Sequence, residues 1–106
     1  MNINELVHEA FTAAQKSGWW EPAKTSLECH MMIVSEIAEA TEECRKDVPH
    51  VYDVDGKPEG EAIELADAVI RIADYFGYKG WNLEEAIRVK MEYNNTRSHR
   101  HGNKKY

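Results

Sequence analysis

Apolar residues recur at the spacing of an α-helix along four stretches of the chain, and none of these stretches shows the strict alternation typical of a half-buried strand. Gly18, Pro49 and Gly77 are typical helix-ending residues behind the first three stretches. Asn82, with Glu85 three residues later, is a typical N-cap for the fourth. The pattern predicts an all-α domain with helices over about residues 3–16, 26–47, 58–76 and 83–96.

The segment between the second and third helices, VPHVYDVDGKP (48–58), interrupts the helical pattern, and we expect a loop whose turn lies at Asp55-Gly56. Pro58 suits the first turn of the third helix. That helix is apolar around most of its circumference, which is typical of a buried helix and here predicts burial between its own chain and a second subunit. Its polar stripe repeats at i, i+3, i+7 and i+10 and consists of Glu64, Asp67, Arg71 and Asp74.

Length and composition limit the classes of protein that fit. A chain of 106 residues predicts a single domain over residues 1–106 with a thin core, which partner subunits would complete. Hydrophobic residues make up 42% and charged residues 30%, a globular balance. No apolar run is long enough to span a bilayer, and no secretory signal is evident, so we expect a cytosolic protein without a membrane partner. Two cysteines exclude a disulfide scaffold and an all-cysteine zinc site.

Charge is unevenly distributed along the chain, whose net charge is −6. The final segment TRSHRHGNKKY (96–106) holds four of the thirteen Lys and Arg residues and no acid, whereas residues 1–95 hold all nineteen acids. An acidic body with a basic tail argues against broad nucleic-acid binding, which needs a basic face on the fold itself. It suits a protein that gathers cations in one place and anionic phosphates in another. A solvated acidic surface is the plainer interpretation of the same charges.

Two pairs of carboxylates repeat one helical turn apart, Glu36 with Glu39 and Glu64 with Asp67. An i, i+3 pair points two carboxylates to the same side of a helix, where they repel unless a cation lies between them. If the second and third helices pack antiparallel, all four carboxylates converge, and Mg²⁺ or Mn²⁺ is the natural guest of such oxygen ligands. The alternative is that both pairs lie on solvated helix faces.

The fourth helix carries a complementary column of residues. Lys90, Asn94 and Arg97 fall at i, i+4 and i+7, within a narrow arc of one face. Two cations and an amide donor match the oxygens of a nucleotide's phosphates, with Arg97 offering a bidentate fork. The alternative is a set of ordinary surface bases that the dipole favours near a helix C-terminus.

In this arrangement of motifs the chain resembles a MazG-like member of the all-α NTP pyrophosphatase superfamily, which is marked by ExxE on one helix and ExxD on the next. The motifs here are Glu36-Ile-Ala-Glu39 and Glu64-Leu-Ala-Asp67, with 24 residues between them. The stretches KPEGEAIELADAVIRIADY (57–75) and KMEYNNTRSHRHGNKKY (90–106) are similar to short, single-domain and often phage-encoded members. The resemblance covers nearly the whole chain.

The resemblance implies a four-helix bundle completed by homo-oligomerisation, as a dimer or tetramer. It also implies Mg²⁺-dependent hydrolysis of a nucleoside triphosphate, ribo or deoxyribo, to the monophosphate and pyrophosphate by metal-activated water attacking the α-phosphorus. Mn²⁺ would substitute, and the compartment would be the host cytoplasm for a phage-encoded form. By family analogy the metal ligands would be Glu36, Glu39, Glu64 and Asp67, the proton acceptor Glu36 or Glu39, and the phosphate-binding residues Lys90, Asn94 and Arg97.

Further features bear on this expectation. Many family members have a second glutamate directly before ExxE, where this chain has Ser35, so activity here would be weaker or would use fewer ions. Trp19 and Trp20 are candidates to stack on the base, or else are core or interface anchors. Two other functions remain open: a non-catalytic helical module for oligomerisation or regulation, and a pyrophosphohydrolase acting on a phosphoribosyl-nucleotide.

Overall fold

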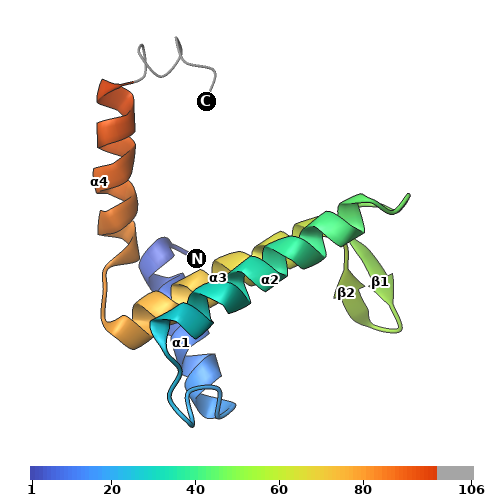
Figure 1. Ribbon diagram of the computed structural model, residues 1–106, viewed down its shortest axis with the longest axis horizontal. Helices are drawn as coiled ribbons and strands as arrows, with labels where there is room; N and C mark the ends of the chain where they lie inside the picture. Colours follow the sequence, from blue (N-terminus) through green and yellow to red (C-terminus); the bar gives the residue numbers. More distant parts are fainter. Residues whose placement is uncertain (98–106) are drawn as a thin grey trace.

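The computed structural model describes residues 1–97, which contain four helices and one two-stranded hairpin (Figure 1). The mostly helical structure agrees with the all-α prediction. Residues 98–106, which make up most of the expected basic tail, lie outside the described residues. In chain order the elements are α1 (Ile3–Lys16), α2 (Ser26–Cys44), β1 (Tyr52–Val54), β2 (Lys57–Glu59), α3 (Glu61–Lys79) and α4 (Leu83–Thr96).

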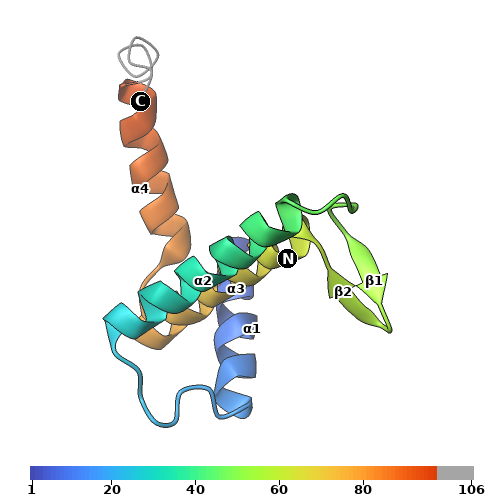
Figure 2. The same ribbon diagram turned by 45° about the vertical axis from the view of Figure 1, so that its right-hand side comes forward.

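Helices α2 and α3 form the centre of the molecule and lie antiparallel, side by side, in both views (Figure 1 and Figure 2). Helix α1 packs across α3, whereas α4 leaves the C-terminal end of α3 and has its main helix contacts with α1. The radius of gyration is 16.4 Å, against about 13 Å for a compact chain of this length. None of the helices in the described part of the chain is long and apolar enough to cross a membrane.

Polar residues cap the start of three helices within residues 1–97, and the sequence predicts one of these caps, Asn82. Capping boxes begin α1 at Asn2 and α2 at Thr25. Asn82 caps α4, and its side chain accepts a hydrogen bond from the Glu85 amide at 2.9 Å. Gly18, with a φ of 82°, follows the end of α1. Of these signals, the sequence analysis predicts the Asn82 cap and the helix end at Gly18.

The hairpin corrects the prediction that the chain contains no strand. Within residues 48–58, Asp53 pairs with Pro58 between two antiparallel strands of three residues each. The turn is at Asp55 and Gly56, as predicted, and their φ angles of 52° and 85° are those of a type I′ turn. Three residues are too few to show an alternating pattern, which explains why the sequence predicts only a loop.

The start of α3 is the second correction, because Pro58 belongs to β2 and the helix begins at Glu61. Gly60 between them has a φ of 121°, and a Cβ there would lie 2.2 Å from the carbonyl oxygen of His50. This position therefore requires glycine and lies outside the helical region. Helix α3 therefore cannot extend back to Pro58.

The end of α3 is the third correction. Gly77, predicted to follow the helix, lies inside it, and α3 continues to Lys79. A Cβ at Gly77 would lie 2.5 Å from the Cβ of Phe11, so this glycine allows α1 to pack closely on α3. The helix ends at Gly80, whose φ is 72°. Helix α2 also differs slightly, since it ends at Cys44, before the predicted residue 47.

The core is small and much apolar surface stays exposed. Among the described residues, no large side chain is completely buried. Leu27 and Met31 on α2 are 75% and 62% exposed, and Val69 on α3 is 50% exposed. Helices α1 and α2 thus cover only part of α3, and coverage of the rest by a second subunit stays a prediction. The core consists of Trp20, Cys29 and Tyr75, with Phe11, Ala14 and Trp19 packed against it.

Candidate metal centre

Three carboxylates from the two central helices meet beside the N-terminal half of α3. Glu36 comes from α2, Glu64 and Asp67 come from α3, and one oxygen from each lies within 4.8 Å of the others. The i, i+3 spacing of the two α3 residues points both carboxylates towards α2. Glu36 is buried, Glu64 is half-buried and Asp67 is exposed, so the cluster has an open side.

Glu39, one turn after Glu36 on α2, lines a hollow together with Glu64. Burial and the neighbouring carboxylates, Glu39 first among them, raise the pKa of Glu64 to about 7. Of the four carboxylates predicted to converge, three thus meet within 4.8 Å of one another, and Glu39 lines a hollow beside Glu64. That they hold a metal stays a prediction.

Arg71 contributes a positive charge beside these carboxylates. Its Nε donates to Glu36 Oε1 at 2.9 Å, and its guanidinium lies 4.6 Å from the centroid of the Trp19 ring. Partial desolvation and the charge of Glu36 raise the pKa of Asp67, and Arg71 opposes that rise. Lys57 of the hairpin lines a hollow of about 240 Å³ that Glu39 and Glu64 also line. The cluster therefore holds more negative than positive charge.

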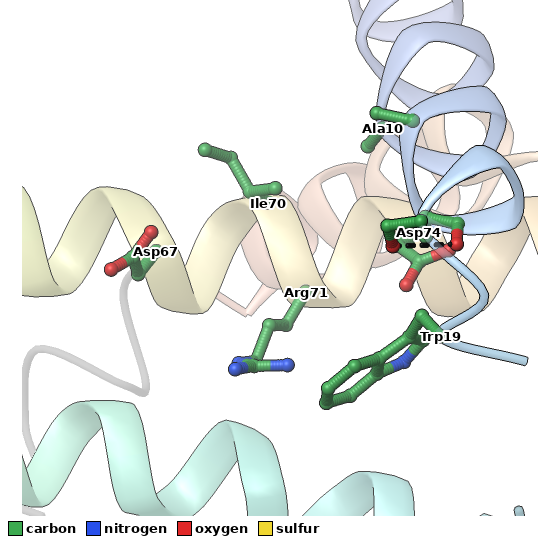
Figure 3. Close-up of a pocket in the computed structure, with 9 residues that line it drawn as sticks. Ala10, Trp19, Asp67, Ile70, Arg71 and Asp74 are labelled. Carbon is green, nitrogen blue, oxygen red and sulfur yellow. Dashed lines mark hydrogen bonds between the residues drawn. The ribbon is translucent and has the colours of Figure 1, made fainter.

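A pocket of about 330 Å³ adjoins the cluster between α1 and α3 (Figure 3). Asp67, Arg71 and Asp74 follow one another along its α3 side, and Trp19 lies next to the Arg71 guanidinium. Small residues of α1, Ala10 among them, leave room on the opposite side. The pocket thus joins one metal-ligand candidate to an aromatic ring.

The two tryptophans have different surroundings. Trp20 is 8% exposed, stacks on Tyr78 with ring centroids 3.7 Å apart, and donates from Nε1 to Asp74 Oδ1 at 2.9 Å. Trp19 is half-buried and lines the pocket, and the Lys24 ammonium lies 4.2 Å from its ring centroid. Trp20 therefore anchors the core, while Trp19 is placed where a ligand would meet it.

The predicted phosphate-binding residues lie along α4, away from the carboxylates. Lys90 and Asn94 are exposed, and Lys90 and Arg97 both approach the Tyr93 ring, with their charged groups 5.3 and 5.2 Å from its centroid. Within residues 1–97, neither cation forms an ion pair. Helix α4 projects from the central pair in both views (Figure 1 and Figure 2). One chain thus does not bring these residues to the carboxylate cluster.

Several contacts of the site are not predicted by the sequence pattern. The stripe that includes Arg71 and Asp74 is evident in the sequence, but the partners Glu36 and Trp20 depend on how the helices align. Lys57 gives no signal at all, because its position near Glu64 depends on the hairpin. Helical spacing finds residues on one face but does not identify what that face meets.

Comparison with known proteins adds no family assignment: the chain matches no protein-family model, no curated protein and no solved structure.

Proposed function

We propose that this protein hydrolyses a nucleoside triphosphate to the monophosphate and pyrophosphate, with Mg²⁺ or Mn²⁺ held by the carboxylate cluster. The observation that carries the proposal is the approach of Glu36, Glu64 and Asp67, whose oxygens lie within 4.8 Å of one another. These residues belong to the ExxE and ExxD motifs on which the resemblance to the MazG-like family rests. The resemblance carried by these motifs implies the reaction, and the proximity of their carboxylates supports the metal site that the reaction needs.

The donor set fits a hard divalent cation. Carboxylate oxygens are the ligands that Mg²⁺ and Mn²⁺ prefer. The raised pKa of Glu64 comes first from its burial and then from neighbouring negative charge, which an additional cation would relieve. Glu36, Glu64 and Asp67 would hold the ion, with Glu39 beside them. When bound, such a cation neutralises phosphate charge and lowers the pKa of a water molecule.

The chain's own residues have distinct parts in the proposed reaction. Glu39 forms no ion pair within the described residues, whereas Glu36 is engaged by Arg71, so Glu39 is the better acceptor for the proton of the attacking water. As the water oxygen bonds to the α-phosphorus, the bond from that phosphorus to the oxygen bridging to the β-phosphorus breaks, and pyrophosphate leaves. Arg71 holds the Glu36 carboxylate in place.

The pocket beside the cluster suits the base and sugar of the nucleotide. Its volume of about 330 Å³ is at the lower end of the range for small-molecule sites, and Trp19 offers an aromatic surface for stacking. Because Trp20 is occupied by Tyr78 and Asp74, we assign the base contact to Trp19 alone. Asp67 links the pocket to the metal centre.

We also propose that the protein self-associates, as a dimer or tetramer. Leu27, Met31 and Val34 fall at i, i+4 and i+7 of α2 and are all more than half exposed, and an apolar row of this kind is typical of a covered surface. A non-catalytic oligomerisation module would share this feature. The carboxylate cluster distinguishes these functions, because an enzyme that acts on a nucleoside triphosphate or a phosphoribosyl-nucleotide needs it and a non-catalytic module does not.

The test is pyrophosphate release from a panel of NTPs, dNTPs and phosphoribosyl-nucleotides with Mg²⁺ or Mn²⁺. We expect release by the wild-type protein and its loss in Glu36→Gln. Glu9→Gln is the matched control, because it makes the same chemical change at an exposed site on α1. Equal release by Glu36→Gln and the wild type would contradict the proposal. Absence of release from every compound by the folded protein would favour the non-catalytic module.

A further inference from the structure

The hairpin brings Lys57 to one side of the carboxylate cluster. In both views the hairpin leaves the end of the central helix pair at which α2 ends and α3 begins (Figure 1 and Figure 2). Within residues 1–97, Lys57 is the one cation that lines the hollow of about 240 Å³ beside the cluster. The other residues that line this hollow are glutamates: Glu39, Glu42, Glu43, Glu59 and Glu64.

Two of these glutamates have a basic partner close by in the sequence. Glu43 pairs with Lys46 at 2.5 Å, and Glu42 pairs with Arg45 at 3.4 Å. The negative charge that remains in the hollow therefore belongs to one glutamate of each metal-ligand motif and to the hairpin's own glutamate. Lys57 is the positive charge that faces these three.

The Lys57 side chain is held at the hollow without being buried. Its Nζ lies 3.2 Å from Glu59 Oε1, and the side chain is 76% exposed. Glu59 raises the pKa of Lys57 most, and the charges of Glu64 and Glu39 add to this rise. The charge of Lys57 in turn opposes the rise in the pKa of Asp67. Because an exposed ion pair contributes little to stability, the ammonium can leave Glu59 for a ligand in the hollow.

The pocket and the hollow adjoin different residues of the cluster. Asp74, Arg71 and Asp67 follow one another along the pocket (Figure 3), whereas Glu64 lines the hollow. Asp67 and Glu64 meet in the cluster, which therefore connects the two spaces. Asp74 and Glu64 are ten residues apart, or about 15 Å along the helix. A nucleotide whose base lies against Trp19 would extend its phosphates past the cluster towards the hollow.

We propose that the Lys57 ammonium serves as the second cation of the site, so that the cluster holds one divalent ion and Lys57 binds the pyrophosphate as it leaves. This inference rests on the proposed function, because it assigns the part of that same site which meets the β- and γ-phosphates. The juxtaposition that carries it is a single ammonium in a glutamate-lined hollow that adjoins the metal-ligand candidates.

The charge that develops on the leaving group explains what Lys57 contributes. When the bond from the α-phosphorus to the bridging oxygen breaks, its electron pair stays on that oxygen, and the pyrophosphate carries the new negative charge. An ammonium that donates a hydrogen bond to this oxygen stabilises the charge without giving up a proton. In sites with two metal ions, the second ion stabilises the leaving oxygen. The repulsion between Lys57 and a second divalent ion disfavours that arrangement here.

The number of Mn²⁺ ions bound in the absence of nucleotide, followed by electron paramagnetic resonance, tests the inference. We expect one ion per chain for the wild-type protein and two for Lys57→Gln, because the carboxylates of the hollow then lack their ammonium. Lys57→Arg keeps the charge and should bind one ion. Lys16→Gln is the matched control, since it removes the same charge at an exposed site at the end of α1, and it should also bind one ion.

The outcomes of this titration are distinct. Two ions on the wild-type protein, or a single ion on Lys57→Gln, would overturn the inference alone. Absence of Mn²⁺ binding by the folded wild-type protein would instead count against the proposed function.

Turnover gives a second test with its own pattern. At the Mn²⁺ concentration that saturates the wild-type protein, we expect Lys57→Gln to lower kcat by about 10²-fold, which is typical for the loss of one charge-stabilising donor. Lys57→Arg should retain most of the wild-type kcat. Higher Mn²⁺ concentrations should restore part of the kcat of Lys57→Gln and leave that of the wild type unchanged. An unchanged kcat in Lys57→Gln, or a loss that no concentration of Mn²⁺ reduces, would contradict the role of Lys57 as second cation.

Discussion

Two aspartates on α3, seven residues apart, have opposite kinds of surroundings. Asp74 is buried, and the Trp20 indole donates a hydrogen bond to it at 2.9 Å. Asp67 instead lies within 4.8 Å of two glutamates, Glu36 and Glu64. Burial raises the pKa of both aspartates, but the Trp20 hydrogen bond lowers that of Asp74 whereas Glu36 raises that of Asp67 further. A buried carboxylate that accepts a hydrogen bond stabilises the fold, whereas carboxylates that face one another favour the binding of a cation.

The largest expected effect separates the two aspartates by turnover. We expect Asp67→Asn to lower kcat by about 10³-fold, because several kcal/mol of charge stabilisation depend on the metal ligands. Asp74→Asn, which keeps an oxygen for the Trp20 donor, should change kcat by less than about tenfold. Pyrophosphate release measured at saturating substrate checks both. Similar losses in the two variants would remove the distinction between the two regions.

The next-largest effect concerns stability, for which we expect the surroundings of Asp74 to matter more than the carboxylate cluster around Asp67. Trp20→Phe leaves Asp74 buried without its donor, so we expect the free energy of unfolding to fall by about 2 kcal/mol. Trp19→Phe is the matched control, and less than about 1 kcal/mol should be lost there because the half-buried ring packs without such a bond. Urea unfolding followed by circular dichroism measures both. Equal losses would show that the Trp20–Asp74 bond is not the stabilising feature.

A smaller effect is a pH dependence that comes from Glu64. Its pKa of about 7 in the folded protein exceeds the ordinary value of 4.5, so between these values the folded state binds more protons than the unfolded state. Stability of the cation-free protein should therefore fall as pH rises from 4.5 to 7, by the order of 1 kcal/mol for this partly solvated group. Glu64→Gln should flatten this part of the profile. The same slope in wild type and variant would contradict the assignment.

Local signals in the sequence predict the helices and the candidate residues of the site. They do not predict which elements contact one another. Helical spacing places Glu64 and Asp67 on one face correctly because both lie in one helix. Gly77 is misread as a helix end, because the steric reason for it is Phe11, far away in the sequence. The partner of Arg71 and the direction of α4 depend on packing angles. Periodicity contains no information about those angles.

The central claim is that the carboxylate cluster binds a divalent cation, and Mn²⁺ binding followed by electron paramagnetic resonance tests it most directly. Free Mn²⁺ gives a strong signal that weakens on binding, so a titration reports occupancy without any assumption about the substrate. We predict at least one ion per chain for the wild-type protein and for Asp74→Asn, and loss of that binding in Asp67→Asn. Equal Mn²⁺ binding by the wild-type protein and Asp67→Asn would contradict the account.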